Sequence, residues 1–431
     1  MKQYKMISFT AILSFVLFLG AVVSSINSTV IAAETDITPN AEAAILLDGE
    51  TGQVLYEKNA DTALGVASMA KMMTEYLVLE AIEEGRISWD QDVLINEYIY
   101  NLSRAPGLSN VGLTQGEAYT VEELYRAMAI FSGNAATVAL AEVVAGTETE
   151  FVKQMNDKAA ELGLEDYKFV NSTGLNNSSL LGQYPEGTGE NEENVMSARD
   201  TAKLAYRLLQ DYPEVLDTAS VSRLEFRDGR SYPNFNWMLP GLIYEYEGVD
   251  GLKTGSTEFA GYGFTATAER DGQRFISVVM KTASQEERFS ETRALLNYAF
   301  SSYSEQEVLE DGFVPEQDSI TVEKGKEAEI AIAGEGSLNL LLESGEAENY
   351  KPVVVLDEES LTAPVEAGQQ VGTIELQYTG EGSSGFIDGD DKMTVPLVTQ
   401  GSVEKANWFV LMFRGIGDFF AGLWGTVIGW F

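Results

Sequence analysis

The sequence predicts an α+β fold, in which helices pack on a mostly antiparallel sheet. A β-hairpin is predicted near the N-terminus, several helical segments follow it, and an antiparallel set of strands precedes a last helix. Runs of helices that are separate from runs of strands are typical of this class. Beyond about residue 305 the composition changes to short alternating strands, which predicts a separate all-β module.

The N-terminal hairpin consists of two apolar runs, residues 43–48 and 53–57, on either side of a Gly-containing loop. That pattern is typical of two strands joined by a turn. After a further loop, an apolar segment from Ser68 to Ile82 predicts a helix that ends near Gly85. The hairpin therefore leads the chain into a buried central helix.

Helical patterns recur between the hairpin and the later strands. Thr120 to Glu123 form a capping box ahead of a helix over 124–131. The tripeptide Ser132-Gly133-Asn134 separates that helix from a small-residue helix over 135–144, and it can point polar side chains into a cleft. The other expected elements are helices over 151–162, 198–209 and 287–300, a loop over 171–191, and strands over 263–268 and 274–280 that a tight Asp271-Gly272 turn joins.

The all-β module is expected over residues 306–400 as a small sandwich. Its strands are short and alternate in polarity, as over 319–322, 328–332 and 373–378, and acidic or Gly-containing turns separate them. It contains no constellation of catalytic side chains, so we predict a spacer role. The catalytic domain is then expected over residues 34–305.

The composition of the chain excludes several functional classes. With 431 residues and 45% hydrophobic residues, the chain can form two or three domains with real cores. A formal charge of −39 argues against binding to nucleic acid, because phosphates need positive partners. We interpret the acidity as a solvated surface, with an acid-mediated binding role as the alternative. The chain has no Cys and no His, so neither disulfides nor a metal site are expected.

Residues 1–33 have the order of a secretory signal peptide. Lys2 and Lys5 precede an apolar run over 12–23, and small residues extend to Ala32 and Ala33. A retained N-terminal anchor is the alternative. Export predicts a site of action outside the cytoplasm, without ATP or nicotinamide pools, and no Gly-rich phosphate loop is found, so no cofactor is expected.

Residues 401–431 are predicted to form an amphipathic helix that lies on a membrane surface. Apolar residues recur in it at helical spacing: Trp408, Leu411, Met412, Phe419, Leu423 and Val427. Only 13 residues follow Asp418, fewer than the roughly 20 that cross a bilayer. A helix that docks on a protein and a helix that spans the membrane are the alternatives.

Ser68 and Lys71 lie three residues apart near the start of the predicted central helix, so they share one helix face. Because the chain has neither His nor Cys, a Ser–Lys pair is the remaining route to covalent acyl chemistry. The spacing alone is a weak signal, since Ser402 and Lys405 also match it. In the structural alternative, Ser68 is only a helix cap and Lys71 lies on a solvated face.

Two more motifs follow in order: Ser132-Gly133-Asn134 between two helices, and Lys253-Thr254-Gly255 on a predicted strand. Ser-x-Asn also occurs at Ser25–Asn27 and Ser337–Asn339, whereas Lys-Thr-Gly occurs once. The ordered triple, with each motif in a fitting context, resembles the signature of penicillin-binding proteins and serine β-lactamases.

The first two motifs suit acyl transfer. Ser68 is the expected nucleophile, at a helix N-terminus that favours developing negative charge. Lys71 is the expected general base, and burial and the nearby Lys253 should lower its pKa. Ser132 can relay a proton to the leaving amine, and Asn134 can orient Lys71 and hold a substrate amide.

The third motif suits substrate binding. Lys253 and Thr254 can bind a substrate carboxylate, and Gly255 allows substrate to lie along the strand edge, unless it only marks a bulge. The backbone N–H groups of Ser68 and Ser256 are candidates for an oxyanion hole.

The chain resembles the low-molecular-mass penicillin-binding proteins, specifically serine-type D-alanyl-D-alanine carboxypeptidases. Segments 43–56, 169–175 and 197–200 are similar to family segments, and Arg288 matches a family arginine near the substrate carboxylate site. The resemblance implies a β-lactamase/transpeptidase-like domain that removes the terminal D-alanine from peptidoglycan stem pentapeptides and is acylated by penicillins. The predicted signal peptide and C-terminal helix together predict a location at the outer face of the cytoplasmic membrane.

The chain departs from the family pattern at three places, where Thr173, Asn194 and Ser256 occupy positions that often carry His, His and a bulky residue. Three rival functions remain open. A serine β-lactamase would need a deacylating carboxylate, for which Glu165 lies in the right interval. A catalytically silent cell-wall binding protein and a D,D-transpeptidase or endopeptidase are the other two.

Overall fold

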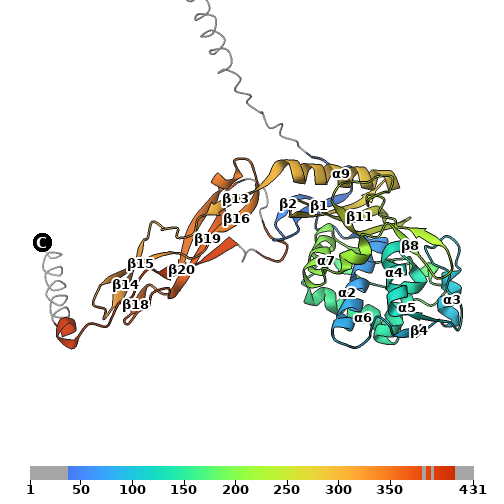
Figure 1. Cartoon of the computed structure of the whole chain (residues 1–431), viewed down its shortest axis with the longest axis horizontal. Coiled ribbons are helices and arrows are strands. Elements are labelled where there is room, and N and C mark those ends of the chain that lie inside the picture. The colour runs from blue at the N-terminus through green and yellow to red at the C-terminus, as the bar shows by residue number, and fades with distance from the viewer. Residues whose placement is uncertain (1–36, 381–384, 390–392, 413–431) are drawn as a thin grey trace, which may run out of the picture. The chain divides into compact units, whose positions relative to one another are not determined.

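The structure is a computed structural model that describes residues 37–380, 385–389 and 393–412 (Figure 1). The chain divides into two units, Met1–Thr38 and Pro39–Phe431, and every element below belongs to the second. The predicted signal peptide and the predicted helix beyond residue 412 lie outside the described residues. Within those ranges, none of the helices combines the length and the apolarity that a bilayer crossing requires.

A five-stranded antiparallel sheet joins the N-terminal hairpin to the later strands. Its order is β10-β11-β12-β1-β2, with β10 and β2 at the edges. The strands are β1 (Ala43–Asp48), β2 (Val54–Lys58), β10 (Val249–Thr257), β11 (Gly261–Arg270) and β12 (Gln273–Thr282). The predicted Asp271-Gly272 turn joins β11 to β12, with φ of 52° and 83°, as a two-residue hairpin turn requires.

Helices cover both faces of this sheet. Every residue of β1 is buried, which a strand achieves only when both faces of its sheet are packed. Figure 1 shows α9 on one face, with α7 and the remaining helices on the other. The helices are α2 (Lys71–Glu83), α3 (Glu97–Ser103), α4 (Val121–Phe131), α5 (Asn134–Ala145), α6 (Glu148–Glu161), α7 (Ala198–Asp211), α8 (Val215–Ala219) and α9 (Gln285–Ser302).

Helix α2 is the predicted buried central helix. Nearly all of its residues are buried, and it packs against α4, α5, α6 and α7. Ser68, however, does not lie in this helix but in a 3₁₀ turn, η1 (Ala67–Ala70), just before it. Ala67 has a positive φ of 45°, which excludes it from an α-helix, and the α-helix begins at Lys71, directly after the 3₁₀ turn.

Short strands and turns complete this domain. The capping box at Thr120 is confirmed, and Ser197 caps α7 as predicted. The short elements are β3 (Leu64–Gly65), β4 (Asp92–Leu94), β5 (Ala118–Thr120), β6 (Tyr167–Lys168), β7 (Val195–Met196), β8 (Arg223–Glu225), β9 (Ser231–Pro233) and η2 (Asn177–Ser179). The three-stranded sheet β3-β7-β6 ties the loop after residue 170 to the segment before η1.

The C-terminal module is all-β, as predicted, and its two sheets enclose one apolar core. One sheet pairs β13 (Tyr303–Leu309) with β16 (Leu338–Glu343), and the other has the order β17-β19-β20-β15-β14-β18. Leu309, Ile332, Leu340, Ile374 and Leu397 all belong to that core. The remaining elements are β14 (Ser319–Glu323), β15 (Glu329–Gly334), β17 (Tyr350–Leu356), β18 (Ser360–Thr362), β19 (Gln370–Tyr378), β20 (Thr394–Thr399) and η3 (Glu346–Asn349).

Candidate active site

The amine of Lys71 is completely buried and has three oxygen neighbours. Its Nζ lies 2.9 Å from Ser68 Oγ, 2.9 Å from Asn134 Oδ1 and 2.5 Å from the carbonyl oxygen of Thr173. The exposed fraction of Lys71 is 0%. Burial, and then the positive charge of Lys253, hold the pKa of Lys71 well below its usual value. The predicted contact between Ser68 and Lys71 is therefore present, and its environment favours the neutral amine.

The turn between α4 and α5 brings the second motif to this amine. Ser132 ends α4 with φ of 55° and ψ of 36°, a left-handed conformation that bulky residues adopt only under constraint. The Asn134 side chain donates from Nδ2 to the carbonyl of Ser109 at 3.0 Å, which leaves Oδ1 facing Lys71. Ser132 Oγ is buried and, among the described residues, has no hydrogen-bond partner.

Strand β10 places the third motif against η1. A Cβ built on Gly255 would lie 2.5 Å from the Val66 carbonyl oxygen and 3.1 Å from the Ser68 nitrogen. We expected Gly255 to make room for substrate along the strand edge. The packing gives another reason: only glycine allows the backbone of η1 to approach β10 this closely.

The cations of the site are also buried. Burial, the largest effect, and Arg288 lower the pKa of Lys253 to about 8, while Glu75 opposes the shift. Burial lowers the pKa of Arg288 to about 10. The Arg288 Nη1 lies 3.4 Å from the carbonyl oxygen of Gly255, so this arginine reaches the end of the Lys-Thr-Gly segment. Thr254 is buried beside Lys253, whereas the following Ser256 is exposed at the end of β10.

Residues 171–174 form a loop beside Lys71 that sequence reasoning did not assign to the site. Asn171 Oδ1 accepts hydrogen bonds from Thr173 N, Thr173 Oγ1 and Gly174 N at 2.7–3.0 Å. Glu148 Oε1 accepts from Ser172 N at 2.9 Å and from Ser172 Oγ at 2.6 Å. These bonds fix the Thr173 carbonyl that faces Lys71. The segment 169–175 was noticed as a family segment, but a backbone acceptor has no sequence signature of its own.

Comparisons with known proteins agree with this geometry. The profile of the D-alanyl-D-alanine carboxypeptidase family matches residues 28–284. The chain belongs to the D-alanyl-D-alanine carboxypeptidase family. The profile of the penicillin-binding protein 5 C-terminal domain matches residues 303–405. This membership makes the chain a serine peptidase of the hydrolase class, directed at D-alanyl-D-alanine termini.

Relatives and solved structures extend the family assignment over most of the chain. The D-alanyl-D-alanine carboxypeptidase DacF of Bacillus subtilis is 32% identical, over 89% of this chain and 91% of the relative. A peptidoglycan synthesis regulatory factor, PBP3, from Streptococcus pneumoniae is 33% identical, with a TM-score of 0.71 over 85% of this chain and 100% of that one. Penicillin-binding protein D2 from Listeria monocytogenes, in its cefotaxime-bound form, is 33% identical, with a TM-score of 0.53 over 62% of this chain and 99% of that one.

Two departures from the carboxypeptidase pattern lie in the supporting loop. Thr173, at one His position, donates its hydroxyl to Asn171 and offers its carbonyl to Lys71. Asn194, at the other, accepts from Val170 N and Asn171 N and donates to the Asn171 carbonyl. The rival residue Glu165 lies elsewhere: its backbone N–H binds the Asp200 carboxylate, in the cap of α7. The residues at the two His positions thus hold the loop by neutral hydrogen bonds.

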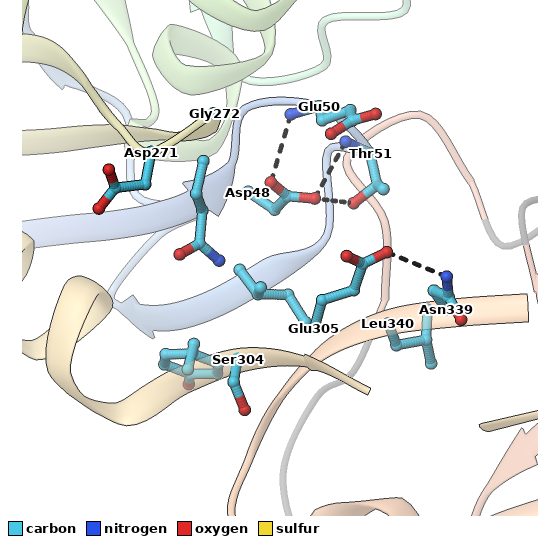
Figure 2. A pocket seen from close by; sticks show the side chains of 12 residues that line it. Asp48, Glu50, Thr51, Asp271, Gly272, Ser304, Glu305, Asn339 and Leu340 are labelled. Atoms are coloured by element: carbon cyan, nitrogen blue, oxygen red, sulfur yellow. Dashed lines mark hydrogen bonds between the residues drawn. The ribbon is translucent and has the colours of Figure 1, made fainter. Parts of the chain in front are cut away.

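A hollow of about 550 Å³, which none of the candidate site residues lines, contains several carboxylates (Figure 2). Asp48 accepts hydrogen bonds from the backbone of Glu50 and Thr51, and Glu305 accepts from Asn339. Two of the carboxylates drawn in Figure 2 therefore have structural partners: Asp48 stabilises a turn, and Glu305 links two strands. In the described part of the chain, no group of three or more acidic residues is arranged to hold a metal ion.

Proposed function

We propose that this carboxypeptidase removes the terminal D-alanine from peptidoglycan stem pentapeptides through an acyl-enzyme on Ser68. The observation that carries the proposal is the environment of the Lys71 amine. A neutral amine has two N–H groups and one lone pair. The Asn134 and Thr173 oxygens carry no hydrogen and so take the two N–H groups. The lone pair is left for the hydroxyl proton of Ser68, 2.9 Å away.

The acylation step follows from this arrangement. The Ser68 hydroxyl gives its proton to Lys71 while Oγ attacks the carbonyl carbon of the scissile amide or of a β-lactam. The backbone N–H groups of Ser68 and Ser256 would stabilise the oxyanion. When the tetrahedral intermediate collapses, the C–N bond breaks and the leaving nitrogen takes the proton from Lys71 through Ser132. The unpartnered, buried hydroxyl of Ser132 supports that relay.

Hydrolysis of the acyl-enzyme repeats the proton transfers with water. Lys71 takes a proton from the water, the hydroxide attacks the ester carbon, and the Ser68 oxygen recovers the proton as the C–O bond breaks. Lys253, Thr254, Ser256 and Arg288 would bind the terminal carboxylate of the substrate. Two buried cations next to each other favour an anion there, because each lacks a counter-ion at contact distance among the described residues.

We further propose the domain organisation that the sequence predicts: a signal peptide over 1–33, a catalytic domain over 34–305, a β-rich spacer over 306–400 and a membrane-surface helix over 401–431. The start of the last segment supports its role, since Trp408 is 64% exposed and stacks on the exposed Phe409. Large exposed aromatic side chains suit a membrane interface. The protein would then act on peptidoglycan at the outer face of the cytoplasmic membrane.

The proposal is tested by the intact mass of the protein after treatment with penicillin, with mapping of the modified peptide. We expect one stable adduct on Ser68 and D-alanine release from a peptide that ends in D-Ala-D-Ala, both lost in Ser68→Ala. Rapid turnover of penicillin would indicate a β-lactamase, and transfer to an added amine would indicate a transpeptidase. Equal release from wild type and Ser68→Ala, or an adduct elsewhere, would contradict the assignment.

A further inference from the structure

A hollow of about 480 Å³ opens at the end of strand β10, directly beyond the Lys-Thr-Gly segment. Its walls include Ser256 at the end of β10, Glu258 in the turn that follows, Tyr262 on β11 and Lys281 on β12. The side chain of a leaving D-alanine is one methyl group, which fills only a small part of this volume. The hollow therefore has room for a larger side chain on the leaving residue.

Contacts join this hollow to the carboxylate site proposed above. Arg288 donates from Nη1 to the carbonyl of Gly255 at 3.4 Å, and its Cζ lies 5.9 Å from the ring centre of Tyr262, in the wall of the hollow. Arg288 is 3% exposed, and among the described residues its Nε has no hydrogen-bond partner. A leaving residue whose carboxylate binds Arg288 and Ser256 would therefore have its side chain at the mouth of the hollow.

Lys281 has an unusual backbone conformation in the wall of the hollow. The pairing of β11 with β12 shifts register between Tyr262 and Phe264, which places Lys281 in a β-bulge. Its φ of 56° is one that a lysine rarely adopts. A Cβ built on Gly261 would lie 3.3 Å from Lys281 Cγ, so the stem of the lysine lies against this glycine. Bulges re-aim side chains, and strained backbone is concentrated at functional sites.

The hollow presents one positive and one negative side chain that are free to bind a ligand. Lys281 and Glu258 are both exposed, and in the part of the chain that the structure describes neither side chain forms a hydrogen bond or an ion pair within 4.0 Å. Another carboxylate at the rim is already engaged, because the Thr257 hydroxyl donates to Glu193 at 2.6 Å. Two opposite charges from different segments of one hollow suit a ligand that carries both charges.

We propose that this hollow binds the side chain of the leaving residue and favours a side chain that ends in an α-amino-acid group. Lys281 would bind the carboxylate of that group, and Glu258 would bind its ammonium. The enzyme would then also cleave the amide between D-alanine and a diamino dicarboxylic acid. The C–N bond breaks as in the acylation above: the D-alanyl group passes to Ser68, and the leaving amine takes the proton through Ser132. This inference rests on the function proposed above, which places the leaving residue beside Ser256.

The test measures kcat/KM for release of the last residue from N-acylated peptides that end in D-Ala-D-X. As residue X, D-Glu and D-Gln differ only in the carboxylate, and D-Lys and its Nε-acetyl derivative differ in the ammonium. Lys281→Gln should lower the D-Glu to D-Gln ratio about threefold from its wild-type value, as expected for an exposed ion pair, without lowering the D-Lys ratio. Glu258→Gln should lower the D-Lys ratio about threefold without lowering the D-Glu ratio.

A peptide in which X is meso-diaminopimelic acid, linked through its D-amine, carries both charges. Wild type should release this residue about three- to tenfold faster than D-norleucine, and each variant should lose part of that preference. Lys351→Gln is the matched control, because Lys351 is an exposed lysine on β17, and its ratios should equal those of wild type. Unchanged ratios in both hollow variants, a uniform change for all peptides, or an equal change in Lys351→Gln would overturn the inference. Failure of wild type to release even D-alanine would instead overturn the proposed function.

Lys281→Gly separates a binding role from a structural one, because glycine adopts this φ without strain. We expect this variant to unfold at a higher urea concentration than wild type and to show the same loss in the D-Glu to D-Gln ratio. A lower unfolding midpoint would show that the Lys281 side chain supports the fold, and it would contradict the proposed role.

Discussion

Gly174 lies so close to Ala67 that a Cβ built on the glycine would be 1.8 Å from the Ala67 carbonyl oxygen. The glycine has a φ of 79°, which L-residues rarely adopt. This contact presses the supporting loop against η1, the turn that carries Ser68. This one backbone contact thereby holds both Ser68 and the Thr173 carbonyl that accepts from Lys71.

Gly174→Ala should therefore abolish penicillin acylation at 37 °C and destabilise the protein by about 2–4 kcal/mol, because it adds both a clash and backbone strain. Gly182→Ala is the matched control, with a φ of 78° but nothing within 4 Å of the added Cβ. It should cost about 1 kcal/mol and retain acylation. Urea unfolding and adduct formation measure the two effects, and equal behaviour of the variants would refute this account of the contact.

Glu148→Ala should destabilise the protein by about 2–3 kcal/mol and slow acylation, because Ser172 N and Oγ lose their acceptor. Glu148→Gln keeps an acceptor oxygen and should cost less than about 1 kcal/mol. Urea unfolding gives the stabilities, and fluorescent penicillin gives the rates. If both variants are acylated at the wild-type rate, the loop does not position Lys71.

The same carboxylate predicts a pH dependence of stability. Burial raises the pKa of Glu148 above its usual value, against the hydrogen bonds from Ser172. Between the unfolded and the folded pKa, the folded protein binds a proton that the unfolded chain has released. Its stabilising contribution is complete below the unfolded pKa and is lost as pH rises through the folded pKa. Glu148→Gln should therefore show a smaller fall in unfolding free energy from about pH 5 to about pH 9 than wild type.

The alkaline limb of acylation should report on Lys253, whose pKa is about 8. Above that pH the site loses the cation that we propose binds the substrate carboxylate. Lys253→Arg should move this limb upward by more than about one pH unit, since arginine stays charged. The exposed Lys351→Arg on β17 is the control and should leave the profile unchanged. An unmoved limb in Lys253→Arg would assign the titration to another group.

Asn134→Asp should slow acylation at neutral pH by about 10²–10³-fold. A carboxylate in place of Oδ1, 2.9 Å from the Lys71 amine, would raise the pKa of Lys71 and keep it protonated. The acid limb of the profile should accordingly move to higher pH. Asn101→Asp, on the exposed face of α3, provides the same change of charge at a solvent-exposed position. Matching profiles for the two asparagine variants would exclude this electrostatic role.

The spacing of the first motif was sufficient to predict the contact of Ser68 with Lys71, and the order of helical and strand-like segments was sufficient to predict the fold class. Side chains three residues apart share one face in a 3₁₀ turn as well as in an α-helix. The contact was therefore predicted correctly, although Ser68 lies in η1 and not in the predicted α-helix. The sequence could not show why Gly255 must be glycine, because the neighbouring Val66 carbonyl comes from a distant segment. It could not show Glu75 either, since burial of a helical charge depends on what packs around the helix.

The deep burial of α2 has a consequence for how drug resistance can evolve. Lys71 and Glu75 are embedded among the apolar residues that hold the domain together, so changes there threaten folding before they alter reactivity. Ser256, by contrast, is exposed at the end of an edge strand and has freedom to vary. Mutations that reduce β-lactam sensitivity while preserving growth are therefore expected at the rim near Ser256, and the core pair should remain fixed under selection.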